Sequence, residues 1–150
     1  MKTSFFVAVL FATSCSSTQY FESAAEVDIL KNTVYASSKE RSTIFKKSYS
    51  PSAQIYWNST VPLNWHELLL GIEESLTQFD EFELLPTEEI HLIINNEGER
   101  WVGLWSVMRV KVGDRERFIP FHVSAQFIDT KIVREAAYWD NLAIEELINP

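Results

Sequence analysis

Cysteine, glycine and histidine are scarce in this sequence, and each scarcity excludes a class of site. The chain has one cysteine, so no disulfide can form within it. Its four glycines are scattered, and none belongs to a glycine-rich phosphate-binding loop. The three histidines show no metal-ligand spacing, and no serine lies at the sharp turn that a hydrolase nucleophile needs. We therefore expect no metal and no cofactor.

Basic side chains are also few. Thirteen Lys and Arg residues stand against 21 Asp and Glu residues, which gives a formal net charge of −8. An acidic chain repels phosphate backbones, so we expect no nucleic-acid partner. No basic cluster is present that would hold an anionic membrane surface.

The longest apolar run is too short to span a membrane. Lys2 precedes an apolar stretch from Phe5 to Phe11, and small residues follow up to Ser14. A basic start, a short apolar run and small residues before a cleavage site are typical of a secretory signal, whereas a membrane span needs roughly 20 residues. Residues 1–14 are therefore predicted to be a signal peptide.

The segment Ala12-Thr13-Ser14-Cys15 resembles a bacterial lipobox, although such boxes more often carry Leu where Ala12 stands. The resemblance implies a lipid on Cys15, with residues 15–26 as lipidated cysteine and tether, and membrane contact through that lipid only. The protein would then lie in the bacterial cell envelope, at the outer membrane or periplasmic face, and Ser16 favours the outer membrane. The alternative is an ordinary cut after Ser14 that leaves Cys15 as a free thiol.

Hydrophobic periodicity predicts helices in the first half of the remaining chain. Residues 27–49 carry apolar side chains at helical spacing, interrupted by a polar segment at 37–41, which indicates two helices or a kink. A short strand is predicted at 53–58. The clearest helix follows, with one apolar stripe from Trp65 to Phe79 and a capping box made by Asn64 and Glu67.

After Pro86 the pattern changes to strands. Short turn-like breaks separate them, so neighbours should pair as antiparallel hairpins. Asp140 can then cap a last helix through Leu147. These elements predict one α+β domain over residues 27–150. The predicted strands are 89–95, 100–112, 117–128 and 131–139.

The order of these elements, together with Pro120-Phe121-His122, Lys131-Ile132-Val133 and Tyr138-Trp139-Asp140-Asn141, resembles the SnoaL-like branch of the nuclear transport factor 2-like superfamily. The resemblance covers about residues 27–148. It implies a cone-shaped α+β fold, in which a curled antiparallel sheet packs on N-terminal helices and one long amphipathic helix. It also implies a ligand pocket between sheet and helices, and a homodimer formed through the outer face of the sheet.

The last hairpin determines which side chains face that pocket. If Asp129-Thr130 is a regular turn, Ser124 pairs with Glu135 and His122 pairs with Ala137. One face is then mostly apolar and the other is mixed, and the mixed face carries His122, Ser124, Glu135, Ala137 and Trp139. Either the apolar face covers the helices, or the mixed face lines the pocket and the apolar face forms the dimer interface.

If the mixed face points inward, His122 and Glu135 are candidates for an acid/base pair. Tyr56, Trp105, Ser124 and Trp139 are then candidates for a ligand pocket. Against catalysis, Ala137 stands where the resemblance to cyclase-like members implies a catalytic Asp, and Ala cannot exchange a proton.

Three functions remain open from the sequence. The first is a secreted, lipid-anchored domain that binds a small apolar organic molecule. The second is an isomerase- or cyclase-type enzyme that uses His122 and Glu135. The third is a structural or protein-interaction module whose pocket is filled by its own aromatic side chains.

Overall fold

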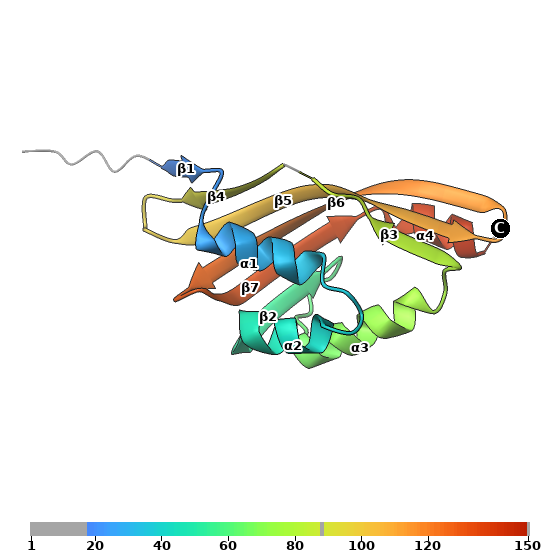
Figure 1. The fold of residues 1–150 in the computed structure, drawn as a ribbon, viewed down its shortest axis with the longest axis horizontal. Helices are drawn as coiled ribbons and strands as arrows, with labels where there is room; N and C mark the ends of the chain where they lie inside the picture. The colour runs from blue at the N-terminus through green and yellow to red at the C-terminus, as the bar shows by residue number, and fades with distance from the viewer. Residues whose placement is uncertain (1–17, 88, 150) are drawn as a thin grey trace, which may run out of the picture.

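The computed structural model describes residues 18–87 and 89–149, and Figure 1 shows their arrangement. The predicted signal peptide and Cys15 lie outside these residues. A curled sheet forms one layer and helices pack against its inner face, which confirms the α+β class. In chain order the elements are β1 (Gln19–Phe21), α1 (Ala25–Val34), α2 (Arg41–Ser48), β2 (Tyr49–Trp57), α3 (Trp65–Leu76), β3 (Glu81–Leu84), β4 (Ile90–Ile94), β5 (Arg100–Val112), β6 (Arg115–Ile128), β7 (Lys131–Trp139) and α4 (Asn141–Ile148).

The sheet follows the order β1-β4-β5-β6-β7-β2, and β3 pairs with β5 beyond the end of β4. The strands from β4 to β7 pair antiparallel, as predicted. Strand β2 pairs parallel with β7, which the sequence did not indicate because the two strands are separated by most of the domain. This pairing brings Trp57 beside Ala137 and closes one side of the inner face.

Local sequence signals explain how the helices begin. The Asn64 side chain accepts hydrogen bonds from the backbone of His66 and Glu67, and Glu67 accepts one from the backbone N–H of Asn64 at 2.8 Å. This capping box fixes the start of α3 as predicted. Asp140 caps α4 by accepting from the backbone N–H groups of Leu142 and Ala143. No helix within the described part of the chain is both long and apolar enough to cross a membrane.

Two short strands were not predicted. Strand β1 lies within the segment that the sequence analysis assigned to a tether, and it pairs with β4 at the sheet edge. Strand β3 follows α3 directly and pairs with β5. Both are short, and their side chains are almost all exposed, so neither has the alternation of apolar and polar residues that identifies a strand in a sequence.

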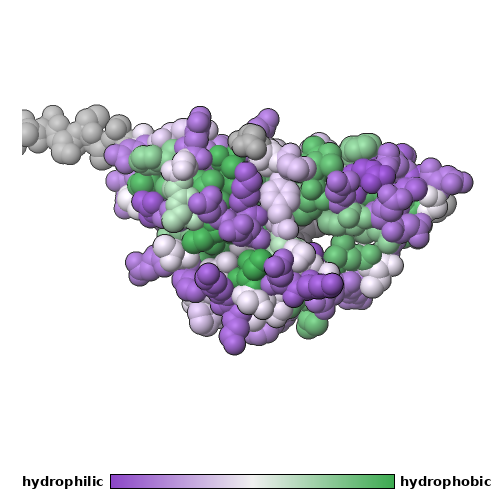
Figure 2. All heavy atoms as spheres, in the orientation of Figure 1, coloured by the Kyte–Doolittle hydropathy of each residue, from purple (hydrophilic) through white to green (hydrophobic). Residues whose placement is uncertain are grey.

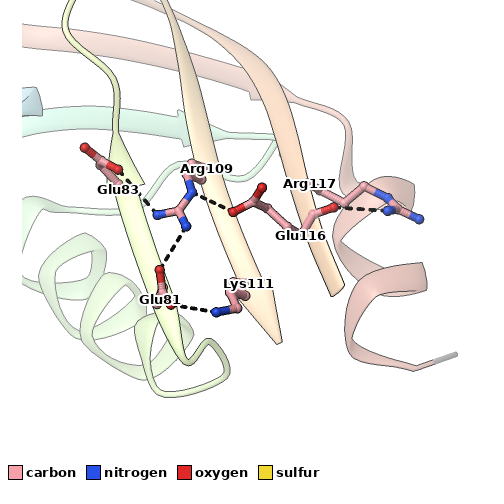
Figure 3. Close-up of polar contacts among 6 residues, drawn as sticks. All are labelled: Glu81, Glu83, Arg109, Lys111, Glu116 and Arg117. Carbon is pink, nitrogen blue, oxygen red and sulfur yellow. Dashed lines mark hydrogen bonds and ion pairs between the residues drawn. The ribbon is translucent and has the colours of Figure 1, made fainter. Parts of the chain in front are cut away.

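Ion pairs join three strands on the outer face of the sheet, as Figure 3 shows. Arg109 of β5 donates to Glu81 of β3 at 3.0 Å and to Glu116 of β6 at 2.7 Å. Lys111 donates to Glu81 at 2.8 Å. These side chains make this end of the outer face polar. Elsewhere, on the side of the molecule seen in Figure 2, polar residues surround separate apolar patches.

Candidate functional site

A β-bulge in the last hairpin decides which residues face the helices. Next to the turn, Phe127 pairs with Ile132 as predicted, but further along Gln126 pairs with Arg134. Val133 is therefore an extra residue on β7, and the bulge shifts the pairing by one. A shift of one residue moves every later side chain to the opposite face of the sheet.

The predicted pairing beyond the bulge was therefore wrong. Glu135 pairs with Ala125, not with Ser124, and His122 pairs with Tyr138, not with Ala137. The apolar side chains of β6 face the helices, which agrees with the first of the two alternatives for that strand. On β7 the bulge turns Glu135, Ala137 and Trp139 to the same inner face, so neither alternative holds for the whole hairpin.

The inner face bounds a cavity of about 370 Å³, which we call the inner pocket. This volume lies within the range typical of small-molecule sites, and the walls are mainly apolar. The aromatic side chains thus leave the interior partly empty, contrary to the expectation for a structural module with a filled pocket. The sheet contributes Phe121, Val123, Ala137 and Trp139, and α3 contributes Leu68, Ile72 and Leu76.

Glu135 supplies the carboxyl group of the inner pocket. Its side chain is 2% exposed, and its two oxygens accept hydrogen bonds from the Tyr49 hydroxyl at 2.7 Å and the Trp57 indole N–H at 2.9 Å. Burial raises the pKa of Glu135, and the two hydrogen bonds oppose this rise. A buried carboxyl group held by two donors can exchange a proton with a ligand or donate a hydrogen bond to it.

The two tryptophans beside this carboxyl group are fixed by Asn58. The rings of Trp57 and Trp139 meet edge to face, with centroids 5.4 Å apart. Asn58 adopts a positive φ of 43°, accepts a hydrogen bond from the Trp139 backbone N–H and donates to the Trp139 carbonyl. These bonds fix the end of β7 against β2 and so position both rings.

The structure brings together only two of the predicted site residues, Glu135 and Trp139. His122, Ser124 and Trp105 lie on the outer face of the sheet, where Trp105 pairs with His122 and is 51% exposed. Tyr56 also faces outward, beneath the guanidinium of Arg134. His122 and Glu135 therefore lie on opposite faces and cannot act together on one ligand.

His122 lies close to a second histidine on the outer face. Its imidazole and that of His91 both approach the place where a side chain on Gly103 would begin, with Nε2 atoms 3.5 and 3.6 Å from it. Burial and the neighbouring His91 lower the pKa of His122. Among the described residues, no three His, Cys, Asp or Glu side chains gather closely enough to hold a metal ion.

Sequence reasoning missed three pocket residues. Tyr49 was assigned to a helix, and Trp57 was considered only as one of several aromatics. The alternation of Ala53, Ile55 and Trp57 with polar neighbours was the available signal, because it places Trp57 and not Tyr56 on the inner face. Arg41 was assigned to the polar interruption at 37–41, whereas it is the first residue of α2, and no sequence pattern identified it as a pocket residue.

No family model matches the sequence, and no curated protein matches it. Solved structures nevertheless share its fold. A protein from Jannaschia sp. CCS1, described as a SnoaL-like polyketide cyclase, superposes with a TM-score of 0.62 at 10% identity, over 84% of this chain and 93% of that chain.

Two further structures superpose similarly. TerC, co-crystallised with polyporic acid, gives a TM-score of 0.64 at 14% identity, over 85% of this chain and 100% of that chain. An NTF2-like protein of unknown function from Burkholderia pseudomallei K96243 gives 0.64 at 15% identity with the same coverage. The chain thus has the nuclear transport factor 2-like fold, in the form also found in SnoaL-like polyketide cyclases.

Proposed function

We propose that this protein binds a small, mostly apolar organic molecule in the inner pocket. The observation that carries the proposal is a cavity of about 370 Å³ with mainly apolar walls and one buried carboxyl group, Glu135. Such a combination gives binding energy through apolar contact and orientation through a single polar group. The co-crystallisation of TerC with polyporic acid and the cyclase names of other neighbours support a small organic ligand.

Two adjacent alanines provide a matched test of this location. Ala137 lines the inner pocket and is 1% exposed, whereas Ala136 faces the opposite side of the sheet. In Ala137→Phe the new ring occupies cavity space, and we expect binding of two-ring and three-ring aromatic ketones, measured by calorimetry, to weaken at least tenfold. Ala136→Phe should leave the affinity within twofold of that of the unchanged protein.

Equal effects of the two substitutions would place the ligand elsewhere and contradict the proposal. Thermal unfolding of both variants shows whether each is folded, because overpacking can destabilise a core. Ala137→Val is a smaller substitution that reduces the cavity with less risk to the fold.

A second candidate function is an enzyme of the isomerase or cyclase type. The observation that favours it is the buried Glu135 carboxyl in the pocket, because burial raises its pKa toward the operating pH, where general acid/base catalysis is most efficient. The candidate differs from the sequence-based hypothesis in that Glu135 would act without His122. Loss of turnover in Glu135→Gln with retained ligand binding would distinguish it from simple binding.

We also propose assembly as a homodimer, because the outer face of the sheet exposes apolar side chains. We further propose export and a lipid on Cys15, because the N-terminal sequence resembles a lipoprotein signal. If Cys15 carries a lipid, only residues 16–18 separate it from strand β1. The domain would then be held close to the membrane surface. Mass measurement of the protein purified from membranes tests for the lipid.

A further inference from the structure

Two side chains that line the inner pocket, Glu135 and Arg41, are of types that are ordinarily charged at neutral pH. One belongs to the sheet and the other to the helices. Glu135 lies on the sheet, in β7. Arg41 lies at the start of α2, and it is the one Lys or Arg among the described residues that line the cavity. The remaining lining side chains are apolar or neutral polar.

Arg41 is fixed among apolar groups of the helical wall. It lines the cavity together with Val34 of α1 and with Phe45, which follows one turn later in α2. Its guanidinium is partly buried, and one of its nitrogens, Nη2, donates to the carbonyl of Ala36 at 3.2 Å. A guanidinium has five N–H donors, and this is the one hydrogen bond that the Arg41 side chain donates within the described part of the chain.

The charge of Arg41 is incompletely balanced. Burial lowers its pKa, which means that the surroundings favour the charged form less than water does, and the carboxylate of Glu73 opposes this effect. Glu73 belongs to α3, and no ion pair between it and Arg41 forms among the described residues. The Arg41 guanidinium, partly desolvated and with N–H donors that make no hydrogen bond within the described residues, therefore lines an apolar cavity.

We propose that Arg41 selects an organic carboxylate: a mostly apolar molecule with one anionic end. A carboxylate matches the guanidinium in geometry, because two parallel N–H donors can bind its two oxygens. The apolar body would extend along the cavity toward Phe121 and Ala137. Glu135 would meet a neutral part of the ligand, since a second carboxylate beside it would be repelled.

This inference rests on the proposed function and names the class of its ligand. The overall charge of −8 strengthens the argument for Arg41. An acidic protein repels anions in general, so it needs a local cation to bind one. Arg41 is also a good residue to substitute. It stands in the first turn of α2, where a positive charge opposes the helix dipole, so its replacement should cost little stability.

The test compares 2-naphthoic acid with 2-naphthamide, which has the same shape but no charge, by calorimetry at pH 7.5. We expect the unchanged protein to bind the acid at least tenfold more tightly than the amide. Arg41→Met should weaken acid binding at least tenfold and change amide binding less than twofold, whereas Arg41→Lys should retain part of the preference. Arg115→Met is the matched control, because Arg115 does not line the cavity and contacts the carbonyl of Glu146.

Glu73 gives a second, independent measurement. The Glu73 carboxylate competes with the carboxylate of the ligand for the positive charge of Arg41. Glu73→Gln removes that competing charge, so acid binding should become two- to threefold tighter while amide binding stays the same. This variant retains Arg41 and does not depend on whether Arg41→Met folds.

The possible failures are distinguishable. Equal binding of acid and amide by the unchanged protein, or a preference that persists in Arg41→Met, overturns the role of Arg41 and leaves the pocket as a site for neutral ligands. Binding of neither compound counts against the proposed function and the inference together. If Arg115→Met reduces the preference for acid over amide as strongly as Arg41→Met does, the preference is a general effect of charge, and the inference is overturned.

Discussion

Glu135 is the residue on which the chemistry of the pocket depends. The sequence singled it out as a carboxyl group on a strand, but its partners could not be predicted. Tyr49 and Trp57 reach it from β2, and that strand lies next to β7 only because of a parallel pairing over a long sequence separation. Long-range pairings of this kind leave no local periodicity in a sequence.

The raised pKa of Glu135 predicts a specific dependence of stability on pH. Because the pKa in the folded state lies above the ordinary value near 4.5, the unfolded chain releases this proton first as the pH rises. The contribution of Glu135 to the free energy of unfolding therefore falls from about pH 4.5 upward, until the folded carboxyl also ionises. Glu135→Gln cannot ionise and lacks this decline.

Urea unfolding of both proteins between pH 4 and pH 8 measures the effect. The difference in the free energy of unfolding, unchanged protein minus Glu135→Gln, should decrease as the pH rises. A difference that is constant or increases over this window would show that burial does not raise the pKa of Glu135.

At the scale of elements, the sequence predicted the helices and the long strands well because their signals are local. The capping box of α3 and the cap of α4 are formed by the residues expected, and β5 has the predicted bounds. The error that changed the site lay in the bulge at Val133, which no residue type in the hairpin indicates. One extra residue turned Glu135 and Trp139 to the face opposite His122. Ser124 and Trp105 share the outer face with His122, and the alternation along β2 places Tyr56 there as well.

The turn of this hairpin is strained at Thr130. Asp129 and Thr130 have φ values of 48° and 62°, and the left-handed region costs an L-residue roughly 1–2 kcal/mol. Asp tolerates this conformation better than the β-branched Thr. Thr130→Gly removes this cost, but glycine also makes the unfolded chain more flexible, which offsets part of the gain. We therefore expect Thr130→Gly to stabilise the protein by about 0.5–1 kcal/mol.

The midpoint of urea unfolding should therefore move to higher concentration in Thr130→Gly. Thr130→Ala retains the Cβ atom and serves as the control, with a smaller gain. A loss of stability in Thr130→Gly would mean that the Thr130 side chain stabilises the turn by more than its conformation costs.

At the scale of the whole molecule, the outer face of the sheet has a polar end and an aromatic middle. At the polar end, the ion pairs of Arg109 and Lys111 connect neighbouring strands (Figure 3). The middle exposes Trp105 and Tyr138, which flank His122 in one cross-strand row. Large exposed aromatics on the outer face of a sheet favour association with another protein surface.

The proposed homodimer predicts a doubled mass in solution. Sedimentation equilibrium of residues 16–150 at micromolar concentrations should give the mass of a dimer, and Trp105→Glu should give that of a monomer, because a charge would be buried in the interface. Leu70→Glu is the control, since Leu70 is exposed on α3 away from the sheet face. A monomeric mass for the unchanged protein would contradict the dimer.

The most direct test of the account is a crystal structure of the protein with the tightest-binding aromatic compound. We predict electron density for that compound in the inner pocket, between β6, β7 and α3, with a polar atom within hydrogen-bond distance of Glu135. Density on the outer face beside Trp105, or an inner pocket closed by its own side chains, would contradict the central claim that this fold holds a small organic ligand inside.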